Sequence, residues 1–231
     1  MPSLVVHYAF VGLLAATLLG AAFDRRSLLL ALAVVTVPDI DSFIALVSEV
    51  GHRAALTNLV IPAVLGGLLA IDLSVRTESF VRSRWGAYGV RVAWFCVLVY
   101  AVGHVLFDAV SGGANLFWPI HDQFYQFRGR LELSTQRGIV QTFVETGGNG
   151  GAGGGGGSSG GGGGLPTPDA MGNTSEIQMD TAVDPDPSGT QDGPVDRIFP
   201  VARGGWQLYL LVVGTVATIG RFVVGHDLPE E

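Results

Sequence analysis

Six histidine and aspartate residues lie within or beside apolar stretches that are long enough to cross a bilayer. An ionisable group in hydrocarbon costs roughly 3 kcal/mol or more, so such a residue marks a functional site by default. Imidazole and carboxylate together are ligands that suit Zn²⁺, Mn²⁺ or Fe²⁺. The sequence therefore predicts a site for a divalent metal ion. Its candidate ligands are His7, Asp39, Asp41, His52, His104 and Asp108.

The spacing of these residues is consistent with one shared site. His104 and Asp108 are four residues apart, which places them on one face of a helix. Asp39 and Asp41 follow Pro38, where a helix breaks or kinks, so both carboxylates can turn inward. A carboxylate in such a site can bind the ion, act as general base or orient a histidine. A metal so held lowers the pKa of bound water, which makes hydrolysis possible.

Other interpretations of single residues remain open. Arg53, next to His52, is expected to bind an anionic substrate group, although such a pair is also typical of a solvated loop. Asp39 and Asp41 could form a helix cap, and His7 could hydrogen-bond at a membrane interface. The pair least easily explained by structure alone is His104 and Asp108.

The composition is that of an integral membrane protein. The chain has 231 residues, of which 48% are hydrophobic and 14% charged, and its mean hydropathy is +0.43. It contains 13 arginines, no lysine and 20 acidic residues, a balance that suggests a salt-loving host such as a halophilic archaeon. No basic patch is visible, which argues against nucleic-acid binding. The single Cys96 lies in an apolar stretch, so no disulfide framework is expected.

The elements that must position these residues are apolar helices. We predict an all-α polytopic membrane protein with about five transmembrane helices. Each predicted segment has about 20 residues, enough to cross a hydrocarbon core of about 30 Å. They span residues 3–23, 27–47, 54–75, 90–110 and 206–224.

Arginine placement predicts the orientation. Arginines lie between the first and second segments and between the third and fourth, so both connections are expected in the cytoplasm. With five crossings, the candidate ligands then fall at similar depth near the extracytoplasmic face of the cell membrane.

Three regions are expected along the chain. Residues 1–145 form the membrane domain with the metal site, residues 146–197 a disordered Gly-rich and acidic linker, and residues 198–231 the last transmembrane helix with a short tail. Within the first region, residues 131–134 and 138–144 are expected to form short strands of a small cap on the outer side.

The ordered set of motifs resembles the YdjM-like family, described as LexA-binding, inner-membrane-associated, metal-dependent hydrolases. The resemblance covers residues 1–145 and implies a membrane-bound hydrolase with a metal cofactor. The family usually has a second histidine about five residues after the His-Arg pair, where this chain has Thr57 and Asn58. The residues that carry the resemblance are His7, Pro38, Asp39, Asp41, His52, Arg53, His104, Asp108, Trp118 and Pro119.

Three functions remain possible at this point. The first is hydrolysis of a lipid or phosphoester by a metal-activated water, with membrane lipids as surroundings. The second is a cation or proton transporter, which predicts polar residues across the whole membrane. The third is an inactive membrane scaffold, in which Thr57 marks a degenerate site. The sequence leaves the substrate, the identity of the metal ion and the oligomeric state open.

Overall fold

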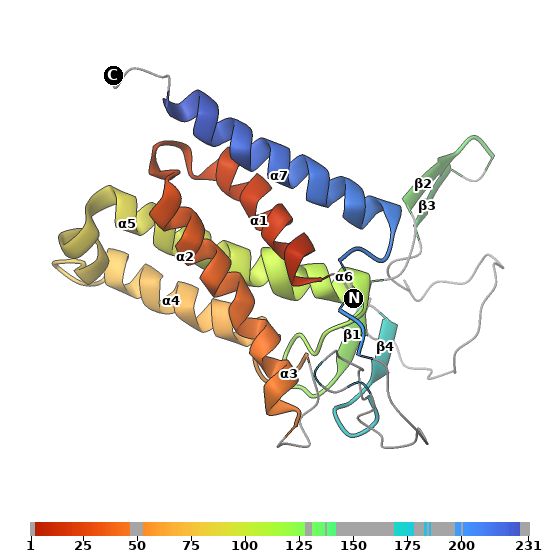
Figure 1. The fold of residues 1–231 in the computed structure, drawn as a ribbon. Coiled ribbons are helices and arrows are strands. Elements are labelled where there is room, and N and C mark those ends of the chain that lie inside the picture. The colour runs from red at the N-terminus through yellow and green to blue at the C-terminus, as the bar shows by residue number, and fades with distance from the viewer. Residues whose placement is uncertain are drawn as a thin grey trace.

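The computed structural model describes residues 3–46, 53–127, 131–136, 138–141, 169–177, 197–199 and 201–226, and the single residues 183 and 185. Its body is a set of apolar helices lying side by side (Figure 1). Helix α7 packs on α1, α1 on α2, α2 on α5, and α5 on α4. The main helices are α1 (Leu4–Leu18), α2 (Arg25–Thr36), α4 (Val60–Ser74), α5 (Phe80–Leu98) and α7 (Gly205–His226).

Each predicted apolar segment overlaps one of these helices, but α5 begins ten residues earlier than expected, and α1 and α4 are shorter than expected. The first ends at Leu18, before a turn in which Gly20 has a φ of 54°, a conformation that glycine adopts without strain. The helix of the third segment, α4, begins only at Val60. Just before it, the Asn58 side chain accepts a hydrogen bond from the Ile61 amide (3.1 Å), which fixes the turn that precedes the helix.

Two helices change their winding where the candidate ligands lie. After α2, the buried Pro38 sits in a 3₁₀ turn (Val37–Ile40), which leads into the short α3 (Asp41–Ile44). Helix α5 continues into a π-helical stretch (Val99–Leu106) and then into α6 (Phe107–Ser111). A π-helix is rare and is found frequently at functional sites.

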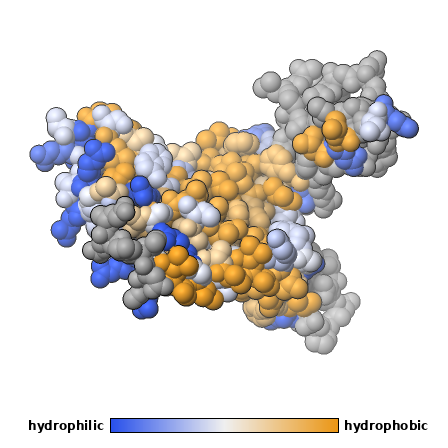
Figure 2. Space-filling model, turned by 90° about the horizontal axis from the view of Figure 1, so that it is seen from above, coloured by the Kyte–Doolittle hydropathy of each residue, from blue (hydrophilic) through white to orange (hydrophobic). Residues whose placement is uncertain are grey.

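Three helical stretches are long and apolar enough to cross a membrane: Arg25–Ile44, Phe80–Ser111 and Gly205–Gly225. Helices α1 and α4 are shorter apolar helices, so five crossings stay a prediction. Figure 2 shows hydrophobic side chains in a broad band over the bundle, with hydrophilic ones concentrated at its left end. On α7, Tyr209 and Val216 leave 71% and 65% of their surface exposed, as expected for side chains that face lipid rather than water.

Two small antiparallel sheets lie beyond one end of the helices. Strand β2 (Leu131–Ser134) pairs with β3 (Gly138–Gln141), close to the strands expected there; residues 142–144 lie outside the described residues. Strand β1 (Phe124–Gln126) pairs with β4 (Asp169–Gly172).

Strand β4 lies within residues 146–197, the segment expected to be a disordered linker. Residues 169–177 dock on the preceding chain, because Asp122 accepts hydrogen bonds from the Thr174 amide (3.1 Å) and hydroxyl (2.6 Å). Burial raises the pKa of Asp122, but bonds from Thr174 and Asn115 outweigh it and lower that pKa overall. No sequence pattern predicts this contact, since the segment has no apolar periodicity. Most of the rest of 146–197 lies outside the described residues.

Small residues let α1 and α7 approach closely. A Cβ atom added to Gly214 of α7 would overlap the backbone carbonyl of Ala9 in α1, and one added to Gly12 would overlap the Thr218 hydroxyl. Close approach through small residues is a common way to pack helices in membranes, where lipid offers no hydrophobic driving force between them.

This contact predicts opposite effects for two alanine substitutions on one helix. Gly214→Ala inserts a methyl group into a filled space and should destabilise the protein by about 1–3 kcal/mol. Gly220→Ala is the matched control, because nothing lies within 4 Å of its added Cβ. It should stabilise the helix by about 0.5–1 kcal/mol. Thermal unfolding in detergent measures both, and equal midpoints for the two variants would contradict the proposed packing.

Candidate metal centre

Two histidines and one aspartate from separate elements meet inside the bundle. His7 lies on α1, His104 on the π-helical stretch and Asp108 on α6. At most 2% of the surface of any of the three residues is exposed. One ligand atom from each lies within 4.8 Å of the others, a grouping that could hold a metal ion. We call these three residues the His-Asp cluster.

Backbone carbonyls fix how both imidazoles are turned. His7 Nδ1 lies 3.0 Å from the Ser3 carbonyl oxygen, and His104 Nδ1 lies 2.8 Å from that of Val35. A carbonyl only accepts hydrogen bonds, so each Nδ1 carries the hydrogen. In a neutral ring the lone pair is then on Nε2. This arrangement, with Nδ1–H on a carbonyl and Nε2 free, is typical of metal-binding histidines.

The two Nε2 atoms both face the Asp108 carboxylate. His7 Nε2 lies 3.4 Å from Oδ1 and His104 Nε2 lies 3.4 Å from Oδ2. Both nitrogens are buried and without a hydrogen-bond partner. Two nitrogen lone pairs next to a carboxylate repel it, so this geometry favours a proton or a metal ion at the nitrogens.

Ring stacking limits what that cation is. The imidazole centroids of His7 and His104 are 4.4 Å apart at an interplanar angle of 15°. Protonating both rings would place two positive charges face to face at this distance, which is unfavourable. The cluster therefore suits a single cation, either one shared proton or one metal ion. The two unpartnered nitrogens fit a metal ion.

Arg53 completes the charge balance of the cluster. It is fully buried, and its Nη2 donates to Asp108 Oδ1 over 2.8 Å while its Nη1 donates to the Gly113 carbonyl over 2.6 Å. A Cβ at Gly112 would lie only 2.7 Å from Nη1, so a residue without a side chain is needed there. Arg53 was expected to bind an anionic substrate group. The structure places its guanidinium against Asp108, and its role towards a substrate stays a prediction.

The two aspartates after Pro38 have different surroundings. Asp39 Oδ1 lies 3.7 Å from His104 Nε2, its Oδ2 has no hydrogen-bond partner, and 32% of its side chain is exposed. Asp41 is buried, and its two oxygens accept the amides of Leu56 (2.7 Å) and Thr57 (2.9 Å). The structure thus places Asp39 beside the His-Asp cluster, whereas Asp41 binds the backbone of the turn before α4.

Two further sequence predictions concern the same turn. His52 lies outside the described residues, so its predicted role as a ligand stays a prediction. Thr57, which stands where the resemblance implies histidine, is fully buried and donates from Oγ1 to the Pro38 carbonyl (3.4 Å). Thr57 thus joins the turn to the chain just before Asp39.

Sequence reasoning missed the groups that orient the histidines. The carbonyls of Ser3 and Val35 carry no signal, because every residue has a carbonyl. Phe107 was also missed: its ring meets His7 edge-on at 5.2 Å and meets Trp206 of α7 at 5.7 Å. The sequence hinted at this contact only by an aromatic residue directly before Asp108.

No protein-family model matches this chain, and neither a curated protein nor a solved structure is found to be similar to it. The resemblance to the YdjM-like family therefore stays a prediction carried by the motifs alone.

The ion pair of Arg53 and Asp108 can be tested through stability. Arg53→Met leaves a buried carboxylate with no fixed positive partner, and should lower the free energy of unfolding by about 3–5 kcal/mol. Adding Asp108→Asn to Arg53→Met removes that charge and should recover part of the loss. Denaturant unfolding measures both. Arg203→Met, at an exposed arginine, serves as the control. An Arg53→Met variant as stable as the control would contradict the pairing.

Proposed function

We propose that this chain is a membrane-bound, metal-dependent hydrolase whose ion is bound by His7, His104 and Asp108. The observation that carries the proposal is the pair of buried, unpartnered Nε2 atoms on either side of one carboxylate. Two imidazoles and a carboxylate suit Zn²⁺, Mn²⁺ or Fe²⁺, and three protein ligands leave room for a reacting molecule, as in catalytic zinc sites. His52 remains a predicted fourth ligand.

A divalent ion bound here would supply a hydrolytic nucleophile, because it lowers the pKa of coordinated water towards neutrality. Asp39 is the residue placed to accept the proton. Its Oδ2 is free of partners, its side chain is partly exposed, and its other oxygen lies 3.7 Å from His104 Nε2. Asp39 therefore serves as general base or as an additional ligand. Asp41 acts as a positioning residue, since it holds the turn at Leu56 and Thr57.

Arg53 prepares Asp108 for this role. Its bond to Oδ1 fixes the carboxylate, so that Oδ2 points towards His104 Nε2. It also neutralises the Asp108 charge inside the protein, where an isolated charge is costly. Asp39 then balances part of the charge of the ion.

We place the site near the extracytoplasmic face of a protein with five membrane crossings. The support is the arginine distribution and the apolar surface of the helices. A site at the membrane boundary suits a lipid or a lipid-linked phosphoester as substrate. The motif resemblance to membrane-bound hydrolases supports the same reaction class.

The buried core between the helices argues against a transport pathway. One cluster of buried residues extends from beneath the His-Asp cluster towards the opposite end of the bundle, and all its members are apolar. They are Val11, Ala15, Leu19, Ala22, Ala31, Val35, Val92, Phe95 and Val99. The members of this cluster offer no polar group to a cation or proton, and Tyr8, which packs against it, shares its hydroxyl with Thr36 Oγ1 (2.8 Å).

A structural role is the second candidate, and the Arg53–Asp108 pair favours it. In that case one imidazole of the His-Asp cluster carries a proton in place of a metal ion, and the cluster serves only to hold the helices together. The two candidates differ in whether a metal ion stays bound.

Metal content separates these candidates. Elemental analysis of the detergent-purified parent should give about one Zn, Mn or Fe per chain. A folded His104→Ala/Asp108→Ala variant should lose it, because two of three ligands are gone. His121→Ala is a matched control at an exposed histidine outside the cluster. If the parent contains no metal after growth with added metal salts, the metal proposal is rejected and the structural role is the remaining candidate.

Catalysis is tested at Asp39. Asp39→Asn keeps the shape of the side chain but removes its basicity, so it should retain the ion and lose activity by about 10²–10⁴-fold. A panel of phospholipid and phosphoester substrates, assayed with the metal-loaded parent, identifies the reaction first. Loss of the ion in Asp39→Asn would make Asp39 a ligand instead, and no turnover of any substrate by the parent would reject the hydrolase proposal.

A further inference from the structure

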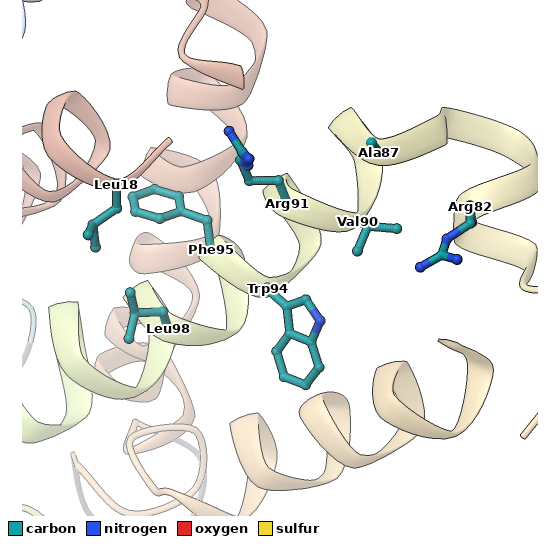
Figure 3. A pocket seen from close by; sticks show the side chains of 8 residues that line it. All are labelled: Leu18, Arg82, Ala87, Val90, Arg91, Trp94, Phe95 and Leu98. Atoms are coloured by element: carbon teal, nitrogen blue, oxygen red, sulfur yellow. The ribbon is translucent and has the colours of Figure 1, made fainter. Parts of the chain in front are cut away.

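A cavity lies at the opposite end of the bundle from the His-Asp cluster. It is open to the surface, has a volume of about 740 Å³ and is formed mainly by α5 together with Leu18 at the end of α1 (Figure 3). Its walls are mostly apolar, with the aromatic rings of Trp94 and Phe95 among them. Apolar walls at the end of a membrane-facing helix suit an acyl chain.

Two guanidinium groups line this apolar cavity. Arg82 and Arg91 form no ion pair with the described carboxylates, and no acidic side chain lines the cavity. Arg91 donates one hydrogen bond, from Nη1 to the Leu19 carbonyl (3.2 Å), which fixes the side chain and leaves its charge uncompensated. Two positive charges beside an apolar wall are complementary to a ligand with an anionic head and a hydrocarbon tail.

A break in α5 lies between the two arginines, which stand at different ends of the cavity (Figure 3). In a straight helix, residues nine apart are about two and a half turns apart and point to opposite sides. Gly86 interrupts the helix between them with φ 63° and ψ −158°. Nothing lies within 4 Å of a Cβ added there, so a lack of room for a side chain is not the reason for glycine at this position. The left-handed conformation explains it, because only glycine adopts it at low cost.

From these observations we infer that the cavity binds the headgroup of an anionic phospholipid. The positive charges of Arg82 and Arg91 attract the headgroup phosphate, the apolar wall receives the first part of an acyl chain, and Trp94 lies at the level of the interface. Basic pockets between membrane helices bind anionic headgroups in this way, and tryptophan is enriched at that depth. The site is independent of the proposed hydrolytic centre.

The test measures lipid selectivity at Trp94 in the full-length protein. Trp85, Trp118 and Trp206 are replaced by Phe, and the protein is reconstituted into phosphatidylcholine vesicles. Quenching of Trp94 by brominated phosphatidylglycerol is compared with quenching by brominated phosphatidylcholine. We expect phosphatidylglycerol to bind at least about fivefold more tightly, and Arg82→Gln/Arg91→Gln to bring the ratio to about one.

Two controls distinguish a specific lipid site in the cavity from general attraction by positive surface charge. Arg76→Gln/Arg84→Gln removes the same charge on nearby chain outside the cavity and should keep the selectivity. Gly86→Ala keeps both arginines but disfavours the break, so it should reduce the selectivity while circular dichroism shows a folded helix bundle.

Three results would overturn the inference. They are equal binding of both lipids by the parent, unchanged selectivity in Arg82→Gln/Arg91→Gln, and an equal loss in Arg76→Gln/Arg84→Gln. Inorganic phosphate, added at constant ionic strength, should leave the selectivity in place. Its loss would identify free phosphate as the ligand instead of a lipid headgroup.

Discussion

The structure depends on the way the buried Asp108 carboxylate is neutralised by its neighbours. A negative charge inside a helical bundle is tolerated only when positive or polar groups surround it. Here the partners come from three separate places in the chain: Arg53 from the turn before α4, His7 from α1 and His104 from one turn earlier in the same helical stretch. Each partner is tied in turn to a backbone carbonyl, so the demands of one charge fix the relative positions of α1, α2, the turn and the segment after α6.

Part of this arrangement was predictable from the sequence. The apolar segments indicated the helices, and the four-residue spacing of His104 and Asp108 placed them on one face. The sequence treated Asp39 and Asp41 alike, whereas the structure separates them, because Asp41 accepts two backbone amides that no side-chain pattern reveals. The pairing of Arg53 with Asp108 was not visible in the sequence for a similar reason, because the two residues lie 55 positions apart. Strand β4 depends on long-range hydrogen bonds to Asp122 and had no local signal at all.

The two ends of the bundle treat charge in opposite ways. At one end, the carboxylate, the guanidinium and the imidazoles are enclosed and balance one another. At the other, Arg82 and Arg91 are exposed and have no carboxylate partner among the described residues. A cluster of buried apolar residues lies between the two sites. A balanced buried set suits tight binding of one small ion, and an open positive pair suits a ligand that arrives from the membrane.

The close contact between α7 and α1 has a consequence for biosynthesis. His7 lies on α1, and α1 packs against α7, which comes much later in the chain, through Gly12 and Gly214. This contact can form only after α7 has been synthesised, so α1 lacks that neighbour until then. The entropy of closing the long intervening segment grows only with the logarithm of its length, so the size of the segment adds little cost. The helix that carries His7 thus gains the support of α7 late in the assembly of the fold.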